Sequence, residues 1–225
     1  MLEGWSPMLE RIVYATLKRE KRVVGVTSPQ PKSGVTSLCE QLAEVSALSG
    51  TRTLFLDMSG QAEPSVPASV WMPGLGNAGQ SITRDPAGYD RLVARFTKAD
   101  RYKYFSAERL RLAFAEDLSV YGAIIVDAPP VPANDTERIN GAAAAAACDG
   151  TLLLCMNGRV SRAELTQAQE ALANTQVALL GVVLNEMQNP TVGEELAREA
   201  RKLRRYLPRV SSWLERKALA SAILN

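Results

Sequence analysis

The sequence predicts an α/β protein with a mainly parallel sheet and helices on both of its faces. Short apolar runs alternate with segments of helical periodicity along most of the chain, which is the pattern of strand–helix–strand units. The crossover between two such parallel strands is right-handed in nearly all proteins and lays the helix over the sheet. Two of the apolar runs end in an aspartate. We therefore expect a functional site at the carboxyl ends of the strands.

The first strand leads into a loop of small residues and then into a helix, within RVVGVTSPQPKSGVTSLCEQL at positions 22–42. This is the order of a P-loop, G-x-x-x-x-G-K-[ST], whose backbone N–H groups bind phosphates while its lysine neutralises them and its hydroxyl binds Mg²⁺. Here Pro29 stands at the first glycine position and Gly34 keeps the second. Val35 replaces the lysine, and Thr36 keeps the hydroxyl. The loop lacks a cation at the usual position.

Two later strands deliver the carboxylates. TRTLFLD at 51–57 ends in Asp57, and YGAIIVDAPPV at 121–131 places Asp127 after a run of apolar residues. Carboxylates at this edge of a P-loop sheet can hold Mg²⁺ directly or through water. The alternative is that each aspartate only caps the turn after its strand.

The other elements follow from periodicity, capping and turn residues. Trp71 is expected to pack back onto the domain, and Ser161 with Glu164 forms a capping box. The predicted elements are helices at 7–19, 38–48, 105–118, 135–147 and 161–175, strands at 90–96, 151–156 and 178–187, and a long Gly- and Pro-rich surface excursion at 60–86.

The composition excludes several classes of function. The 225 residues include three cysteines and no histidine, which argues against a disulfide framework, Cys/His zinc sites and histidine-dependent nucleophilic catalysis. A net charge of +2 implies no basic face for nucleic acid. No apolar run approaches the ~20 residues of a membrane span, and the N-terminus lacks a signal peptide. We expect a cytoplasmic protein.

The motifs, in this order, resemble those of bacterial tyrosine kinases (BY-kinases), P-loop proteins that partner polysaccharide co-polymerases and are related to partition-type and septum-positioning ATPases. Their Walker A loop runs V-x-G-V-T-S-x-x-P-G-E-G-K-S-T-L. Matches without a gap are Gly25, Thr27, Ser28, Pro31, Gly34 and Leu38. Asp57 resembles the first carboxylate of the family's D-x-D, and Asp127 lies in a segment similar to I-I-x-D-x-P-P. Asn185 resembles the asparagine of G-V-V-L-N, which lies near the adenine.

The resemblance implies a P-loop NTPase-like fold and a site for ATP and Mg²⁺. Asp57 and Asp127 would be catalytic, and both would hold the metal together with Thr36. The nucleotide would be bound by Ser28, Pro31, Lys32, Ser33, Gly34, Val35, Thr36, Ser37 and Asn185.

Several departures predict a degenerate member. Besides Val35, Lys32 falls on a family glycine and Ser33 on an acidic position. The family's E-x-x-R-x-x-R helix packs between subunits, whereas Glu10 here is followed by valine and threonine at those spacings, so we do not expect rings formed by that route. After Asn189 the only tyrosine is Tyr206, so the autophosphorylated tyrosine-rich tail is absent.

A basic amphipathic segment takes the place of that tail. We predict a P-loop domain at 1–190 and a helical extension at 191–225 within the same structural unit. An apolar stripe at Leu196, Ala200, Leu203, Leu207, Val210 and Leu214 is flanked by Arg198, Arg201, Lys202, Arg204, Arg205 and Arg209. The helix could pack on its own domain, or dock on an acidic partner or on anionic lipid.

The main functional hypothesis is a regulatory or scaffolding subunit in the synthesis and export of exopolysaccharide, capsule or adhesin polysaccharide. It would lie at the inner membrane through a co-polymerase or another export-machinery protein, and could form homo-oligomers. The alternative is an active ATP-dependent tyrosine kinase or ATPase in which another cation replaces the lysine. A partition-type ATPase is weaker, because its signature lysine would fall at Gln30.

Overall fold

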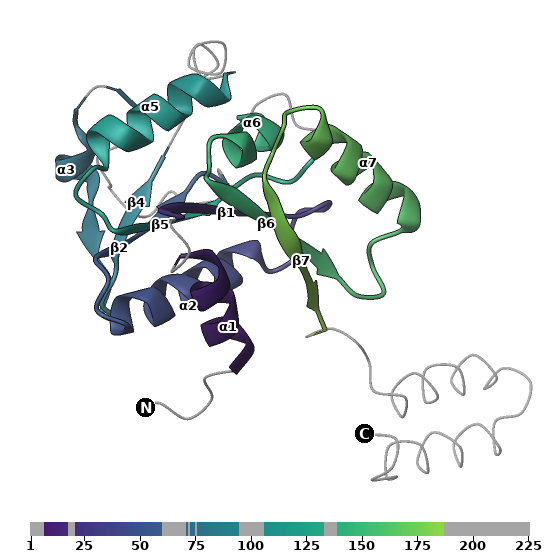
Figure 1. Cartoon of the computed structure of the whole chain (residues 1–225), viewed down its shortest axis with the longest axis horizontal. Coiled ribbons are helices and arrows are strands. Elements are labelled where there is room, and N and C mark those ends of the chain that lie inside the picture. The colour runs from purple at the N-terminus through teal and green to yellow at the C-terminus, as the bar shows by residue number, and fades with distance from the viewer. Residues whose placement is uncertain are drawn as a thin grey trace, which may run out of the picture. The chain divides into compact units, whose positions relative to one another are not determined.

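A mainly parallel sheet forms the centre of the protein in the computed structural model (Figure 1). Its strands are β1 (Val23–Thr27), β2 (Thr53–Asp57), β3 (Thr83–Arg84), β4 (Asp90–Val93), β5 (Ala123–Asp127), β6 (Gly150–Met156) and β7 (Leu179–Asn185). The helices are α1 (Pro7–Thr16), α2 (Val35–Leu48), α3 (Ala78–Ser81), α5 (Ala107–Asp117), α6 (Gly141–Ala146) and α7 (Arg162–Ala173). The structure describes residues 7–17, 21–59, 71, 73–74, 76–94, 106–132 and 139–186.

The chain divides into two units, Met1–Asn185 and Glu186–Asn225, and every element named above belongs to the first. The predicted helical extension at 191–225 lies outside the described residues. Among the described helices, none has the length and hydropathy needed to cross a bilayer.

The sheet has seven strands in the order β3-β4-β2-β5-β1-β6-β7. All neighbouring strands run parallel except β3 and β4, which are antiparallel. β1, β2, β5 and β6 are buried at every position, and strands covered on both faces read as continuous apolar runs. The predicted fold class is confirmed.

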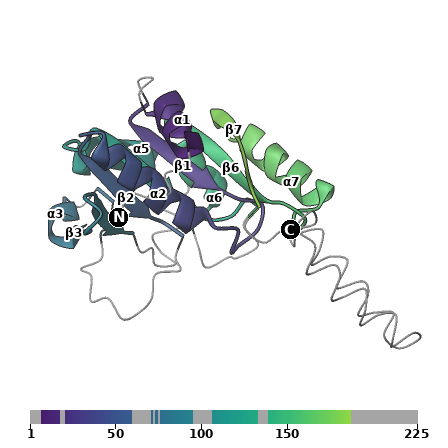
Figure 2. The same cartoon turned by 90° about the horizontal axis from the view of Figure 1, so that it is seen from below.

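Helices cover both faces of the sheet (Figures 1 and 2). α1 and α2 lie on one face, where Leu42 and Val45 pack against Val26 and Phe55. On the other face, α5 lies over β2 and β5, α6 lies over β1 and β6, and α7 extends this layer toward β7. The core therefore consists of two apolar layers, one on each side of the sheet.

Most elements lie where periodicity predicted them, and α7 begins with the predicted capping box of Ser161 and Glu164. α6 begins only at Gly141, where Asn140 accepts hydrogen bonds from backbone N–H groups of the first turn, so the prediction of a helix from 135 was too long within the described part. Ser106 is the N-cap residue of α5, but its side chain makes no capping hydrogen bond.

The 60–86 segment is more than a surface excursion in the part that the structure describes. Trp71 is fully buried, stacks on Phe114 and donates its indole N–H to Asp117 at 3.0 Å. The same carboxylate accepts the backbone N–H of Gly74 at 2.8 Å. α3 and β3 follow within the same segment. Trp71 packs onto the domain as predicted, but α3 and β3 were missed.

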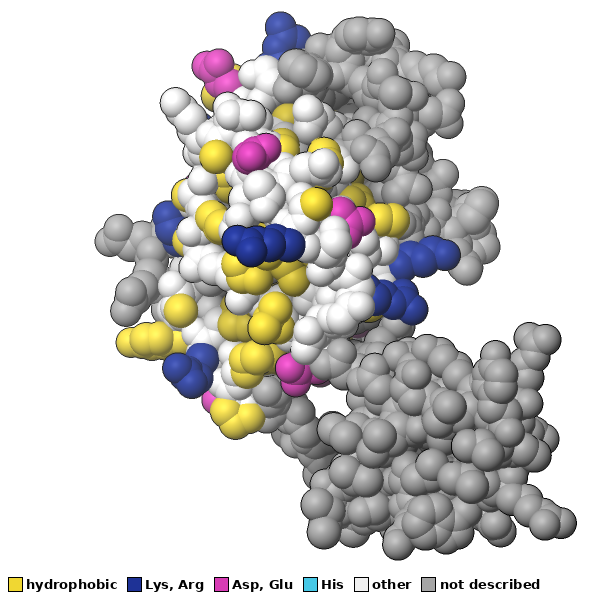
Figure 3. Space-filling model, turned by 90° about the vertical axis from the view of Figure 1, so that its right-hand side faces the viewer, with side chains coloured by type: hydrophobic (Ala, Val, Ile, Leu, Met, Phe, Trp, Pro, Cys, Tyr) yellow, Lys and Arg dark blue, Asp and Glu magenta, His cyan; other side chains and the backbone are white. Residues whose placement is uncertain are grey.

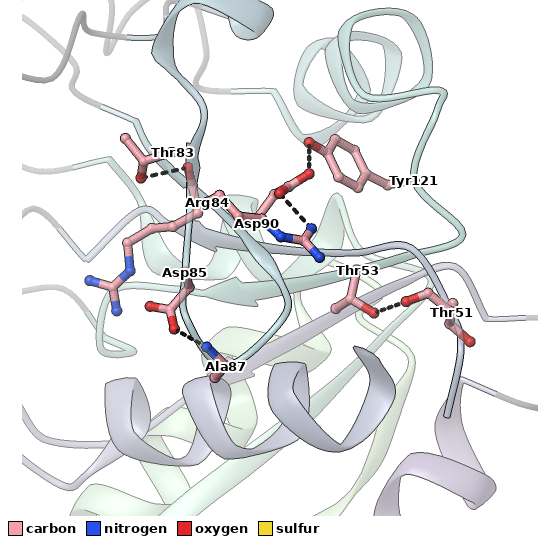
Figure 4. Close-up of polar contacts among 9 residues, drawn as sticks. Thr51, Thr53, Thr83, Arg84, Asp85, Ala87, Asp90 and Tyr121 are labelled. Atoms are coloured by element: carbon pink, nitrogen blue, oxygen red, sulfur yellow. Dashed lines mark hydrogen bonds and ion pairs between the residues drawn. The ribbon is translucent and has the colours of Figure 1, made fainter. Parts of the chain in front are cut away.

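A polar cluster ties the strands together at their N-terminal ends, the edge opposite the predicted site (Figure 4). Asp90 begins β4 and accepts hydrogen bonds from Tyr121 and Arg84, each at 2.8 Å. Beside them, the hydroxyl of Thr53 donates to the carbonyl of Thr51 at 2.9 Å. The buried Asp90 carboxylate is thus satisfied within the fold, which gives this cluster a structural role.

The edge of the sheet formed by β7 carries an apolar surface. β7 is an edge strand, and its side chains Leu179, Val182 and Leu184 are exposed. Figure 3 shows this side of the molecule, where hydrophobic side chains gather among a few charged ones.

Candidate active site

A pocket of about 260 Å³ opens at the carboxyl ends of β1 and β5, beside the N-terminus of α2. Nine of the eleven predicted site residues line it. The lining residues are Ser28, Pro31, Lys32, Ser33, Gly34, Val35, Thr36, Ser37, Ser59, Asp127, Ala128 and Pro130. Asp57 and Asn185 are the two predicted site residues that do not line it.

The loop after β1 has two residues in the left-handed region. Lys32 has φ 60° and Gly34, the N-cap of α2, has φ 93°. A lysine in this conformation costs about 1 kcal/mol, whereas a glycine tolerates it. A Cβ atom at position 34 would lie 2.7 Å from Nδ2 of Asn185. Gly34 is therefore required both by its dihedral angle and by the neighbouring side chain.

Hydrogen bonds within the loop converge on one carbonyl. The backbone oxygen of Gln30 accepts the hydroxyl of Ser28 at 2.5 Å and that of Ser33 at 2.7 Å. Both hydroxyls thus close the loop on itself, and this supports a local shape without a ligand.

Two side chains join this loop to the last strand–helix–strand unit. Nε2 of Gln30 donates to Oε1 of Glu164 at 2.6 Å, so Gln30 contacts the first turn of α7. Nδ2 of Asn185 donates to the carbonyl of Ser33 at 2.9 Å. The sequence placed Asn185 near an adenine; in the structure its amide holds the loop, and the base contact stays a prediction.

Asp127 is the carboxylate of the pocket. It is 1% exposed at the end of β5, and its Oδ2 accepts the hydroxyl of Thr36 at 2.6 Å. Burial raises the pKa of Asp127 to about 7; the Thr36 hydrogen bond opposes this shift, and the charge of Asp57 adds to it. A proton or a cation would therefore stabilise this side chain.

Asp57 lies beside Asp127 in the sheet register but serves the turn that follows its own strand. Its Oδ1 accepts the backbone N–H of Ser59 at 2.9 Å and the Ser59 hydroxyl at 2.7 Å. This is the capping role that the sequence left open. Ser59 also lines the pocket, although it was not among the predicted site residues. It lies two residues after Asp57, where the D-x-D pattern has its second carboxylate, and this spacing could have identified it.

Val35 carries no charge to the pocket. The side chain is partly buried and packs against the apolar cluster beneath α1 and α2. The lysine position of the P-loop is thus occupied by a side chain that also contributes to the core.

The residues present fit a magnesium–nucleotide pair. Mg²⁺ commonly binds through one or two carboxylates together with substrate phosphates, and Thr36 and Asp127 offer such oxygen atoms. In the described ranges no three Cys, Asp or Glu side chains form a complete metal site, so phosphate oxygens would have to complete the coordination. A bound magnesium ion would neutralise charge on the phosphates. The loop backbone and the α2 N-terminus would hold the phosphates themselves.

Comparisons with known proteins agree with this architecture. No protein-family model matches the chain. The chain is 23% identical over 194 residues to tyrosine-protein kinase YwqD of Bacillus subtilis (strain 168), covering 81% of this chain and 80% of that protein. The kinase domain of Escherichia coli tyrosine kinase ETK superposes with a TM-score of 0.63 and 22% identity, covering 81% and 74% of the two chains.

A second type of P-loop protein has the same architecture. Cobyrinic acid a,c-diamide synthase from Mycobacterium smegmatis, solved with ADP and magnesium, superposes with a TM-score of 0.60 and 19% identity, covering 72% and 73% of the two chains. The P-loop NTPase-like fold predicted from the sequence is therefore confirmed.

Proposed function

We propose that the chain is a P-loop protein of the bacterial tyrosine kinase type and acts as a catalytically impaired regulatory or scaffolding subunit in polysaccharide synthesis and export. Exopolysaccharide, capsule and adhesin polysaccharide are the products to which the sequence resemblance points. The nucleotide pocket would then serve binding or regulation rather than rapid phosphoryl transfer.

The packing of Val35 is the observation that carries this proposal. A P-loop lysine places its positive charge next to the phosphate oxygens on which negative charge develops during phosphoryl transfer. Val35 instead packs against the core. Removing one such stabilising group from an active site typically lowers the rate by about 10²–10³-fold. Residues 190–225 contain a single tyrosine, Tyr206, so this stretch is not a tyrosine cluster of the kind that the family phosphorylates.

The proposed partner is an inner-membrane polysaccharide co-polymerase or another protein of the export machinery. The resemblance to bacterial tyrosine kinases supports this partner. The basic residues of the 191–225 segment would favour an acidic partner surface or anionic lipid at the cytoplasmic leaflet. The protein would then lie at the membrane peripherally, and it could assemble with further copies of itself.

Membrane attachment tests this proposal. The full-length chain should sediment with membranes that contain the cognate co-polymerase and remain in the supernatant with membranes that lack it. Replacing Arg201, Lys202, Arg204 and Arg205 by glutamate should abolish sedimentation, because it reverses the local charge, and raised salt should weaken attachment of the unchanged protein.

The control for this experiment is stability. Exposed charges usually contribute within ~0.5 kcal/mol, so the charge-reversed protein should unfold at nearly the same temperature as the unchanged one. If the charge-reversed protein still sediments, the segment is not the docking element. If neither protein distinguishes membranes with and without the co-polymerase, the proposed partner is wrong.

An active ATP-dependent tyrosine kinase or ATPase remains the second candidate. The hydrogen-bonded pair of Thr36 and Asp127 favours it, because these residues retain the metal-binding groups of the family. Formation of phosphotyrosine on incubation with magnesium–ATP distinguishes the two candidates.

A further inference from the structure

A cation lines the pocket although position 35 carries none. Lys32 is exposed and belongs to the pocket wall, three residues before Val35. Asp127 is the other charged residue of that wall, and it already accepts the Thr36 hydroxyl. Within the described part of the chain, the ammonium group of Lys32 has no ion pair or hydrogen-bond partner.

We infer that Lys32 supplies the phosphate-binding charge that a P-loop usually takes from the residue at position 35. The ligand would be a polyphosphate chain, such as that of a nucleoside triphosphate, recognised mainly through its phosphates. This inference rests on the nucleotide site of the proposed function and assigns its missing cation to a residue of the same loop.

The position of Lys32 in the loop supports this assignment. Its backbone has φ 60°, a conformation that is unfavourable for a lysine and that the family pattern fills with glycine. The hydroxyls of Ser28 and Ser33 and the amide of Asn185 fix the loop around it. A long, flexible stem then carries the ammonium group, which acts on phosphate as a point charge and needs no fixed approach.

The size and lining of the pocket favour phosphates over a base. Pockets for drug-sized ligands usually measure about 300–1,000 Å³, and this one measures about 260 Å³. None of the described residues that line the pocket is aromatic, so this part of the wall offers no surface for stacking a purine. Backbone N–H groups at the start of α2, the Thr36 hydroxyl and the Lys32 cation are all suited to anionic oxygens.

Binding measurements on the full-length protein test the inference. Magnesium–ATP and magnesium–tripolyphosphate would be titrated by calorimetry into the unchanged protein and into Lys32→Gln, which keeps a side chain at the positive φ and removes the charge. We expect Lys32→Gln to weaken both probes by about tenfold or more, because it removes a charged contact to phosphate. Lys32→Arg, which keeps the charge, should retain binding of both.

Arg11→Gln is the matched control. Arg11 is an exposed cation on α1 that does not line the pocket, and its loss changes the net charge by the same amount. This control should bind both probes within about twofold of the unchanged protein, because exposed charges outside the pocket are screened.

Three outcomes would overturn the inference: equal binding by Lys32→Gln and the unchanged protein, a loss for ATP without a loss for tripolyphosphate, and no binding of either probe at millimolar concentration. None of these outcomes depends on phosphotyrosine formation or on membrane attachment. The proposed function can therefore fail or stand separately.

Discussion

Two residues of the loop after β1 determine what the pocket can do. Val35 packs against the core at the position where a P-loop carries its lysine, and Lys32 brings a cation to the pocket wall from a position where the family has glycine. The Thr36 hydroxyl donates a hydrogen bond to the Asp127 carboxylate in the same pocket. The pocket therefore keeps the oxygen atoms of Thr36 and Asp127, but its cation lies at position 32 instead of position 35.

Restoring the lysine should strengthen nucleotide binding. Val35→Lys is expected to raise the affinity for magnesium–ATP by about tenfold, since it adds a charged contact to phosphate. Adding Lys32→Gly should offset that gain, because it removes the phosphate-binding charge assigned to Lys32, even though glycine suits the φ of 60° at that position. Val35→Met, which adds length without charge, is the control and should show no gain. A folded Val35→Lys protein that binds no better would mean that the loop differs from the family in shape as well as in charge.

The buried carboxyl of Asp127 should make stability depend on pH. Burial raises the pKa of Asp127 from 3.8 to about 7 in the folded protein, so the stabilising contribution of its proton is complete below the ordinary pKa and is lost as the pH rises through about 7. Asp127→Asn keeps an acceptor for Thr36 and cannot ionise. In metal-free buffer it should therefore be more stable than the unchanged protein above about pH 7, by on the order of a few kcal/mol.

Thermal unfolding between about pH 4 and pH 8 checks this prediction. The unfolding temperature of the unchanged protein should fall across this range relative to that of Asp127→Asn. Glu116→Gln removes an exposed carboxylate on α5 and should follow the unchanged protein. Parallel curves for Asp127→Asn and the unchanged protein would show that this carboxyl ionises normally in the folded state.

At the scale of elements, the loop after β1 is connected to the unit formed by β6, α7 and β7. Gln30 contacts Glu164 in the first turn of α7, and Asn185 at the end of β7 holds the carbonyl of Ser33. A movement of α7 or of the end of β7 would therefore change the loop directly. Both contacts are donated by neutral amide groups, one on the loop and one at the end of β7.

Asn185→Ala should loosen the loop. Loss of one hydrogen bond to a backbone carbonyl is expected to lower the free energy of unfolding by about 1 kcal/mol. Amide hydrogens at 28–36 should exchange faster with solvent, as measured by hydrogen–deuterium exchange and mass spectrometry. Asn174→Ala, at an exposed residue just after α7, should leave exchange in the loop unchanged. Unaltered exchange at 28–36 in Asn185→Ala would show that the bond to Ser33 does not hold the loop.

Sequence patterns predicted the strands and most helices because each element has a local physical cause. β1, β2, β5 and β6 are covered on both faces, and so each appears in the sequence as an unbroken apolar run. The capping box of α7 lies within four consecutive residues. α3 and β3 were missed because a segment rich in glycine and proline gives no periodicity for such short elements.

The part of the site that consists of short local motifs could be predicted from the sequence. The loop residues and Asp127 line one pocket, as expected from their positions at the carboxyl ends of neighbouring strands. The contact between Asn185 and Ser33 spans 152 residues of sequence, and that between Gln30 and Glu164 spans 134, so no local pattern could reveal either. Whether Asp57 faces a ligand or its own turn also depended on a side-chain rotamer, and the structure shows it bonded to Ser59.

At the scale of the whole molecule, the chain has a P-loop NTPase-like fold whose loop carries valine at the position of the usual lysine. The seven-stranded sheet and its two helical layers place the loop, Thr36 and Asp127 as the fold requires. Position 35 carries a valine, and residues 190–225 contain a single tyrosine, Tyr206.

Phosphotyrosine formation tests this account most directly. The purified full-length chain would be incubated with magnesium–ATP for several hours, and every tyrosine-containing peptide would be analysed by mass spectrometry. We predict no phosphotyrosine at Tyr206 or elsewhere, because Val35 places no charge where a P-loop lysine stabilises the transferred phosphoryl group, and the Lys32 cation is assigned to phosphate binding alone. Phosphotyrosine that accumulates with time, together with micromolar affinity for magnesium–ATP, would contradict it and identify the chain as an active kinase.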